Sequence, residues 1–583
     1  MRKGKRAIRW MIFWASALAL GGLSVSGGTS APVLVGRERH VIAGYDEPNT
    51  PPLSPVSERV RAAITDPAAF VDGHLNLNRA IYVRFFDRGR EAPPRSIVIF
   101  IPGIVAGANS FERLADQLVH RSGGAVEVWA VDRRANLLED ARAMIAAEKA
   151  QTMAAALAAL DAYQNHPSGP GGVLANPPYE YELSRFMAEW GLDVHLRDLK
   201  AIVQQARNSG GASRPQIFLG GHDFVGADLA ALFAAYDFDG VPGFTLIDGL
   251  ILLDGTPSVA ASPRAPQIRS DEEYLRSGVV IGGMLRIPGL HRLRHPEESG
   301  EPPFLGGDLF GPFSFQLAEI LAQFALYAPH RASPLPVDIG PPVPSTNVAA
   351  FALNTDDEFA EQAQQRFSFG FLAVPPGRSV ADVAESRPDP DRANPNGLFA
   401  PRDLGTDPDG RPVLQDWAGV RDLSPLGLEG KEVSDWEDVA RGFLYGAGNG
   451  EVDVSRGEAN FIEWFFPQRL VLDILLAARL DTSSLSSAIL NALTERGGNP
   501  LTVIHNREVN VPVLGISAGQ GIFAGETRPL PTVFAFFPYQ RSIASTRFCA
   551  TEVSEYAHND VLWSREPRVA DLIIAFMNGG CPR

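Results

Sequence analysis

Apolar runs and helical patterns alternate along the first half of the chain. Uninterrupted apolar runs predict strands at 79–87, 95–104, 126–134, 215–221 and 248–257. The segments between them predict helices at 111–121, 192–203 and 224–238. In the second helix, Leu192, Leu196, Leu199 and Val203 recur at spacings of four, three and four, which places them on one face. Strands that are apolar throughout and alternate with helices predict a parallel sheet covered on both faces.

This alternation stops after Gly255 and resumes near the C-terminus. Residues 256–510 are rich in Pro and Gly and carry helical patterns at 312–327, 356–371 and 461–480. The last pattern, dense in aromatic residues but interrupted by Pro467, predicts a buried or pocket-lining helix. Strands are then predicted at 509–519 and 532–537 and a final helix at 567–577.

The pattern thus divides the chain into four parts. We expect a signal peptide at 1–30, an α/β core at 31–255 that begins irregularly, a mainly helical cap or lid insertion at 256–510, and the remainder of the core at 511–583.

The N-terminal segment has the layout of a secretory signal peptide. Its first ten residues include five basic ones, and the apolar run at 11–23 spans 13 residues, whereas a membrane span needs about 20. We therefore expect export to the periplasm or beyond, with no stable membrane span after cleavage. An uncleaved anchor remains the alternative.

The composition and net charge indicate the class of protein and argue against one class of partner. With 583 residues, 45% hydrophobic and 21% charged, the chain has the composition of a globular protein. Its net charge of −16 argues against nucleic acid as a partner. The two cysteines, Cys549 and Cys581, either pair and tie the C-terminal tail to the loop before His558 or remain separate thiols.

The stretch GGHDFVG, 220–226, carries the strongest chemical signal. It joins a predicted strand to a predicted helix, and a glycine two residues before Asp223 allows a sharp bend. The Asp223 side chain would then project above the sheet edge, with the N–H of Phe224 facing the same point. The alternative is an ordinary turn in which Asp223 caps the helix. We expect the His222 side chain to be structural and to point away from the pocket.

Two further stretches could supply the other groups that a catalytic site around Asp223 needs, an oxyanion hole and a base. The turn FIPGIVAG, 100–107, offers backbone N–H groups at Ile104 or Val105 for one side of an oxyanion hole. The loop YAHNDVLWS, 556–564, precedes the final helix and supplies His558 as the candidate base. Asp254, at the end of the strand after the GGHDFVG helix, is the favoured acid partner.

Two other carboxylates compete for this role. Glu526 lies after the next predicted strand, and Asp560 lies two residues beyond His558.

These stretches resemble the α/β-hydrolase superfamily over roughly 95–255 and 511–583. The segments EVWAVDRRANLLED, WGLDVHLRDLKAIV and FIEWFFPQRL look like a poorly characterised group of large bacterial α/β-fold hydrolases, whose elbow usually reads GHSLGG. The aspartate resembles instead the GHDWG elbow of haloalkane dehalogenases and epoxide hydrolases. Here Val225 also stands where a glycine is usual, and Gly226 follows one residue later. The resemblance implies the α/β-hydrolase fold.

An aspartate at this position changes the expected chemistry. With a reference pKa of about 3.9, a carboxylate is ionised at neutral pH and attacks saturated carbon without a base. The chain is therefore expected to hydrolyse a small or apolar organic substrate through an alkyl–enzyme ester on Asp223. His558 would activate water, Asp254 would orient His558, and the N–H groups of Ile104 or Val105 and of Phe224 would hold the oxyanion.

Leaving-group chemistry and the alternative function remain open. Phe224 lacks the indole N–H that dehalogenases place after their nucleophile, which favours epoxide opening, with Tyr274, Tyr327 and Tyr445 as candidate acids. The competing hypothesis is a relative of serine esterases or lipases whose nucleophile is replaced, and which is inactive or a binding protein. The chain has no phosphate loop, dinucleotide fingerprint, CxxC or HExxH, so neither a cofactor nor a metal site is expected. The sequence does not indicate the oligomeric state.

Overall fold

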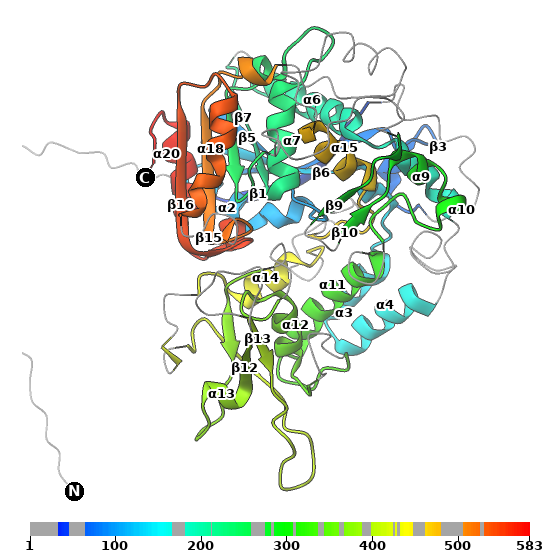
Figure 1. Cartoon of the computed structure of the whole chain (residues 1–583), viewed down its shortest axis with the longest axis vertical. Coiled ribbons are helices and arrows are strands. Elements are labelled where there is room, and N and C mark those ends of the chain that lie inside the picture. The colour runs from blue at the N-terminus through cyan, green and yellow to red at the C-terminus, as the bar shows by residue number, and fades with distance from the viewer. Residues whose placement is uncertain are drawn as a thin grey trace, which may run out of the picture. The chain divides into compact units, whose positions relative to one another are not determined.

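One eight-stranded sheet organises the protein, in the order β1, β4, β6, β5, β7, β8, β15, β16 (Figure 1). From β6 to β16 all neighbours are parallel, whereas β4 runs antiparallel to both β1 and β6. The strands are β1 (Val35–Ala43), β4 (Arg79–Asp87), β5 (Ser96–Ile101), β6 (Val126–Asp132), β7 (Gln216–His222), β8 (Gly249–Leu253), β15 (Val513–Gln520) and β16 (Phe548–Ala557).

The computed structural model describes most of the chain from Val33 onward, and these residues fall in a single unit. The described ranges are 33–45, 64–165, 181–211, 213–257, 275–281, 285–306, 311–335, 343–360, 366–387, 398–423, 426–427, 432–446, 461–479, 505–524 and 530–582. The predicted signal peptide therefore lies outside the described residues. Within them, no helix combines the length and apolar character that crossing a membrane requires.

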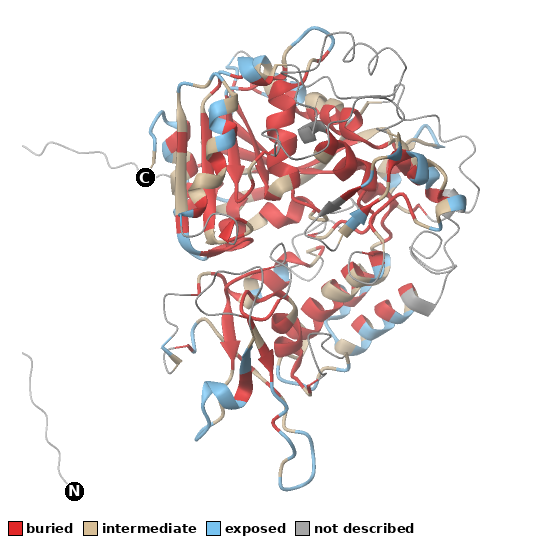
Figure 2. Cartoon of the chain, viewed as in Figure 1, coloured by how far each residue is buried: buried red, intermediate tan, exposed pale blue. Residues whose placement is uncertain are grey.

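Helices cover both faces of the sheet, and each face has its own apolar core. Along β5, Ile97 and Ile99 face one core while Val98 and Phe100 face the other, because successive side chains of a strand point to opposite faces. The first core includes α6 (Leu192–Ser209) and α7 (Asp223–Ala235), and the second includes α2 (Glu112–Arg121) and α20 (Arg568–Met577). The central strands are accordingly buried (Figure 2).

Between β8 and β15 the chain forms helices and small two-stranded sheets. Its helices are α9 (Leu290–Arg294), α10 (Pro296–Ser299), α11 (Pro312–Tyr327), α12 (Asn347–Thr355), α13 (Val380–Val383), α14 (Trp436–Gly442) and α15 (Gln468–Arg479). Its strands pair as β9 (Val279–Ile281) with β10 (Leu285–Ile287), β11 (Gly370–Leu372) with β14 (Trp417–Gly419), and β12 (Ala384–Arg387) with β13 (Leu398–Pro401). The boundary of 256–510 for a separate cap remains a prediction.

Shorter elements complete the described fold. The helices α3 (Arg142–Ala150) and α4 (Met153–Asn165) follow β6, and α11 packs against α4 and α12. The remaining elements are β2 (Phe70–Val71), β3 (His74–Leu75), α18 (Phe537–Ser542) and α19 (Asp560–Trp563).

Several sequence predictions were wrong at the edges of the sheet. The core is predicted to begin irregularly, yet β1 lies near its start, and the mixed polar pattern of β1 suits a half-buried edge strand. The strand predicted at 532–537 is mainly a 3-10 helix, and β16 was missed. Cys549 therefore lies in a strand rather than a loop. It forms a disulfide with Cys581, with 5.4 Å between the Cα atoms, which ties β16 to the C-terminal tail.

Two predicted helices in the insertion were also wrong in extent. The pattern at 356–371 is not helical where described, because α12 ends at Thr355 and the Asp356 carboxylate accepts a hydrogen bond from the Glu358 N–H, forming a turn. The helix predicted at 461–480 begins only at Gln468, directly after Pro467. Proline restricts the residue before it to extended backbone, so the helix does not extend toward the N-terminus.

Close backbone approaches explain the glycines of the GGHDFVG turn. Asp223 takes a left-handed φ of 62° between β7 and α7. A Cβ atom on Gly221 would lie 1.9 Å from the Gly226 carbonyl oxygen, and one on Gly226 would lie 2.4 Å from the Ile101 carbonyl oxygen. Positions 221 and 226 must therefore both lack a side chain, whereas Val225 fits into the apolar core.

We predict that Gly226→Ala destabilises the protein by about 2 kcal/mol or more, because the clashing atoms are backbone and cannot rotate away. Urea unfolding followed by circular dichroism measures the loss. Gly89→Ala is the control, since its Cβ atom would meet only an Asp87 carboxylate oxygen at 3.4 Å. An effect no larger than that of the control contradicts the steric explanation of the turn.

Candidate active site

Three side chains from the carboxyl edge of the sheet converge on one point. Asp223 follows β7, Asp254 follows β8 and His558 follows β16. The Nδ1 atom of His558 lies 2.6 Å from Oδ2 of Asp254, and Nε2 of His558 lies 3.7 Å from Oδ1 of Asp223. All three residues are at most 1% exposed. The structure thus brings together the three residues that the sequence singled out. His558 contacts Asp254 through Nδ1 and faces Asp223 through Nε2.

The two oxygens of the Asp223 carboxylate have different surroundings. Oδ2 accepts a hydrogen bond from the Ile104 N–H at 2.8 Å, and the N–H groups of Phe224 and Val225 also hydrogen-bond the carboxylate. Oδ1 is buried and has no hydrogen-bond donor among the described residues. Burial raises the pKa of Asp223, while His558 and the three N–H groups oppose this rise. One oxygen is therefore held by the backbone and the other faces His558.

Asp254 fixes the orientation of His558. Its Oδ1 accepts from the Ala518 N–H at 2.9 Å, and its Oδ2 accepts from the Ile522 N–H at 3.2 Å as well as from His558 Nδ1. A Cβ atom on Gly521 would lie only 2.0 Å from Asp254 Oδ2, so the loop passes close because that residue is glycine. Because Nδ1 donates its proton to Asp254, the lone pair of Nε2 faces Asp223, as a general base requires.

Asp560 and Glu526 were the alternatives to Asp254 as the partner of His558. Asp560 accepts hydrogen bonds from the Ala557 N–H, the Ser368 N–H and the Ser434 hydroxyl, so its oxygens hold the backbone around the histidine loop. Burial raises the pKa of Asp560 to about 7. Glu526 lies outside the described residues. The contact with the His558 ring belongs to Asp254.

The His222 side chain, expected to be structural, lies against His558. The two rings stack with centroids 4.3 Å apart, and His222 Nε2 donates to the His558 carbonyl oxygen at 3.1 Å. Burial lowers the pKa of His222 well below its ordinary value, with a further contribution from His558, so its ring is neutral. The sequence placed His222 next to Asp223 but did not show that the ring supports His558.

The turn at 100–107 presents the N–H of Ile104, rather than that of Val105, to Asp223. Val105 takes a left-handed φ of 51°, and its carbonyl oxygen accepts from the Glu463 N–H at 2.8 Å. Gly107 donates to the Phe461 carbonyl oxygen at 2.7 Å. The insertion therefore pairs with this turn along its backbone.

Arg133 binds the backbone of the same turn, at 100–107, and the sequence did not single it out. Its guanidinium donates to the carbonyl oxygens of Pro102, Gly103 and Ala106 at 2.7–3.0 Å and pairs with Glu463 at 2.9 Å. Arg133 and Glu463 are both buried. Arginine at the end of β6 carries no recognisable signal, because its partners come from distant segments. This ion pair joins the insertion to the turn that carries Ile104.

The candidate tyrosines lie beside other partners. The Tyr445 hydroxyl hydrogen-bonds the Glu319 carboxylate. The Tyr327 hydroxyl is buried without a hydrogen-bond partner among the described residues, and burial, with a smaller contribution from the Glu148 charge, raises the pKa of Tyr327. Tyr274 lies outside the described residues. The structure records no contact between Asp223 and either described tyrosine.

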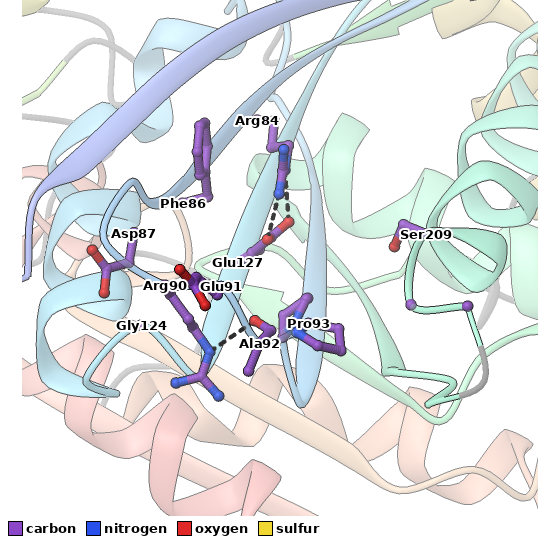
Figure 3. Close-up of a pocket in the computed structure, with 13 residues that line it drawn as sticks. Arg84, Phe86, Asp87, Arg90, Glu91, Ala92, Pro93, Gly124, Glu127 and Ser209 are labelled. Carbon is purple, nitrogen blue, oxygen red and sulfur yellow. Dashed lines mark hydrogen bonds and ion pairs between the residues drawn. The ribbon is translucent and has the colours of Figure 1, made fainter.

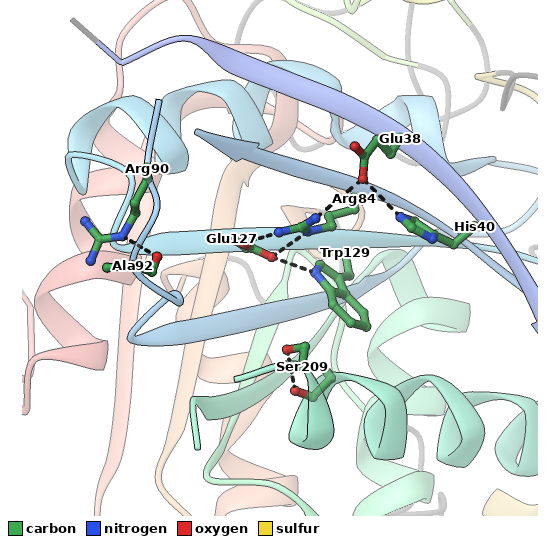
Figure 4. A network of polar contacts seen from close by, with 9 residues as sticks. Glu38, His40, Arg84, Arg90, Ala92, Glu127, Trp129 and Ser209 are labelled. Atoms are coloured by element: carbon green, nitrogen blue, oxygen red, sulfur yellow. Dashed lines mark hydrogen bonds and ion pairs between the residues drawn. The ribbon is translucent and has the colours of Figure 1, made fainter. Parts of the chain in front are cut away.

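A cavity of about 380 Å³ lies at the opposite edge of the sheet (Figure 3). Its wall includes Glu127 at the beginning of β6, whereas Asp223 and Asp254 follow the carboxyl ends of parallel strands. Arg84 in this wall donates twice to Glu127, at 2.6 and 2.8 Å, and contacts Glu38 (Figure 4). The arginine charge is thus neutralised within the protein, and the cavity is separate from the candidate active site.

No protein-family model and no curated protein matches this chain. Solved structures do match in a structural search. A Sulfolobus solfataricus protein provisionally assigned as a lipase is 12% identical, with 94% of this chain and 97% of that chain covered and a TM-score of 0.38. A peroxisomal α/β-hydrolase of Saccharomyces cerevisiae is 10% identical, with 94% of this chain and 90% of that chain covered and a TM-score of 0.35. An epoxide hydrolase of Vigna radiata is 12% identical, with 86% of this chain and 94% of that chain covered and a TM-score of 0.33.

The fold itself is defined by the chain's own topology. The sheet is parallel from β6 to β16, with β4 antiparallel beside it, and a strained turn after β7 leads directly into α7. This protein therefore has the α/β-hydrolase fold, as the sequence predicted.

The buried Arg133–Glu463 pair generates a pH prediction. Burial raises the pKa of Glu463 to about 7, against the opposing effect of Arg133. The folded state then binds more protons than the unfolded state between about pH 4.5 and 7, so this group's contribution to stability is present below that window and is lost as pH rises through it. As pH rises through this window, the free energy of unfolding of Glu463→Gln should therefore increase by about 3 kcal/mol relative to that of wild type. The reason is that the rise in the Glu463 pKa from 4.5 to about 7 corresponds to roughly 2.5 pKa units.

Urea unfolding at pH 4.5 and pH 8 measures this difference. Glu555→Gln, which removes an exposed carboxylate paired with Arg568, should give the same difference from wild type at both pH values. A Glu463→Gln difference that is equally independent of pH contradicts the raised pKa.

Proposed function

We propose that this protein is a hydrolase that forms a covalent alkyl ester on Asp223. The observation that carries the proposal is the asymmetry of the Asp223 carboxylate. Oδ2 is hydrogen-bonded by Ile104, whereas Oδ1 has no donor among the described residues and lies beside His558 Nε2. A carboxylate arranged in this way has one oxygen available for attack and one already placed for the oxyanion that forms later.

In the first step, Oδ1 of Asp223 attacks a saturated carbon of the substrate. The new Oδ1–C bond forms as the bond to the leaving oxygen or halide breaks, and the leaving group departs with the electron pair. No base is needed for this step, because a carboxylate carries no proton to remove. The N–H groups around Oδ2 keep the carboxylate in position.

In the second step, water opens the ester. His558 Nε2 removes a proton from the water, whose oxygen attacks Cγ of Asp223, and negative charge develops on Oδ2 beside the Ile104 N–H. The Cγ–Oδ1 bond then breaks, and the departing alkoxide takes the proton from His558. Asp254 stabilises the imidazolium that exists between these two proton transfers.

The same geometry disfavours ester acyl transfer. A carboxylate that attacked an ester carbonyl would form a reactive anhydride. In addition, Oδ2 accepts the Ile104 hydrogen bond that would otherwise hold the substrate's carbonyl oxygen. This occupied donor is why we favour attack at carbon over the alternative of a serine esterase relative with a replaced nucleophile.

We propose a small or apolar substrate. Two of the residues whose N–H groups bind the Asp223 carboxylate, Ile104 and Phe224, are apolar, and the Ile462 backbone pairs with Ala106 on the turn that carries Ile104. Phe224 has no donor for a halide, so an epoxide is the first class to test.

Asp223 should acquire an oxygen atom from water during turnover. We predict that wild-type protein, incubated in heavy-oxygen water with an epoxide panel and then digested, carries the label in the peptide that contains Asp223. The label enters because water attacks Cγ rather than the substrate. Turnover without label in this peptide contradicts the carboxylate nucleophile.

The variant His558→Gln should trap the alkyl ester, because water is no longer activated while Asp223 can still attack. Intact-mass spectrometry would then show an added substrate mass. His120→Gln, which alters an exposed histidine in α2, is the control and should show no trapped adduct. Absence of an adduct with a substrate that wild type hydrolyses contradicts the mechanism. No turnover by wild type, combined with esterase activity in Asp223→Ser, would support the replaced-serine alternative.

We also propose that the protein is exported through the segment 1–30. The Cys549–Cys581 disulfide supports this, because such bonds persist mainly in oxidising compartments. Cell fractionation of a C-terminally tagged chain should find a shortened protein in the periplasm or medium, and removal of 1–30 should leave it in the cytoplasm. Equal distribution of the two forms contradicts export.

A further inference from the structure

Four carboxylates gather in the interior of the insertion. Asp356, Asp357 and Glu358 directly follow α12, and Glu432 comes from a separate segment that precedes α14 (Figure 1). One oxygen from each lies within 4.8 Å of the others. All four residues are at most 6% exposed. This acidic cluster is therefore formed by tertiary folding and shielded from solvent.

Hydrogen bonds fix Asp356 and Glu432 but do not satisfy every carboxylate oxygen of the cluster among the described residues. Asp356 accepts from the N–H groups of Glu358 and Phe369, and Glu432 accepts from the Ser368 hydroxyl and the Gly370 N–H. The Oε2 atom of Glu358 is buried and has no hydrogen-bond partner among the described residues. A buried carboxylate oxygen directed into other carboxylates lacks the partner that its burial requires.

Three of the four carboxylates have no basic partner among the described residues. Among the described residues, no ion pair joins Asp356, Glu358 or Glu432 to a basic side chain. Burial raises the pKa of each of these three carboxyls, and the neighbouring carboxylates raise it further. Bringing these groups together without a cation is unfavourable, whereas a bound cation offsets both the burial and the mutual repulsion.

The ligand chemistry indicates the type of ion. All four candidate ligands are carboxylates, and hard divalent cations prefer oxygen ligands, whereas zinc sites in proteins usually include His or Cys. Ca²⁺ takes six to eight oxygens in flexible geometry, which four carboxylates binding through one or two oxygens each can approach. Mg²⁺ requires stricter octahedral geometry and retains more water, which suits a buried cluster less well.

We propose that Asp356, Asp357, Glu358 and Glu432 bind one Ca²⁺ ion inside the insertion. The ion holds the turn after α12 to the segment before α14. Ser368 connects this site to the histidine loop, because its hydroxyl donates to Glu432 and its N–H donates to Asp560. The Asn559 N–H also donates to the Arg366 carbonyl oxygen at 3.0 Å. Ca²⁺ thereby stabilises the loop that carries His558.

Calorimetric titration of the purified full chain tests the proposal. The protein is first treated with EDTA, the chelator is removed, and CaCl₂ is titrated in. We expect one Ca²⁺ per chain, with weaker binding of MgCl₂, and affinity that falls about tenfold or more in Glu358→Gln, because ligand charge sets affinity at such sites. Glu385→Gln, an exposed carboxylate in the same insertion, should bind as wild type does.

Thermal unfolding of the wild type provides a second measurement that does not depend on the variant folding. The Tm should rise with CaCl₂ concentration and fall after EDTA treatment, because a ligand that binds only the folded state stabilises it. Absence of calcium binding, equal binding by wild type and Glu358→Gln, or a wild-type Tm that is independent of CaCl₂ would each overturn the proposal. The last result would indicate that the carboxyls share protons instead.

Discussion

The left-handed backbone at Asp223 is the constraint on which the candidate site depends. With φ at 62°, the turn lifts the carboxylate from the end of β7 toward both the Ile104 N–H and the His558 ring. Such a conformation is costly for a residue with a side chain and persists only where the surroundings enforce it. Here Gly221 and Gly226 permit the tight approach of α7 to β7 and β5, and hydrogen bonds to the carboxylate hold the result.

Contacts from the insertion reach the site through buried polar groups. Glu463 pairs with Arg133, which binds three carbonyl oxygens of the turn that presents Ile104. On the other side, the Ser368 N–H and the Ser434 hydroxyl donate to Asp560 within the histidine loop. Both halves of the site are thus attached to residues that the chain contributes between β8 and β15. Short hydrogen-bonded paths therefore join the insertion to the turn that carries Ile104 and to the histidine loop.

Much of this organisation could be predicted from local sequence, and the rest could not. The central strands are apolar runs that fold only into a buried sheet, so β5, β6, β7 and β8 were evident. The edge strand β1 was missed because an edge tolerates polar residues on both faces. The convergence of Asp223, Asp254 and His558 could be expected because each residue sits at a strand end with a recognisable setting. Arg133, His222 and the acidic cluster were missed because their roles come from contacts between distant segments.

The unequal surroundings of the two Asp223 oxygens have a stereochemical consequence. In the proposed cycle, Oδ1 approaches the substrate carbon opposite the leaving group, so that carbon inverts once. The later water attack takes place at Cγ of Asp223 and does not touch the substrate carbon again. The product therefore keeps the inverted configuration, and in the first cycle its new oxygen comes from the protein. Inversion at a single carbon is thus the expected result of attack by Asp223, through the oxygen that the Ile104 N–H leaves available.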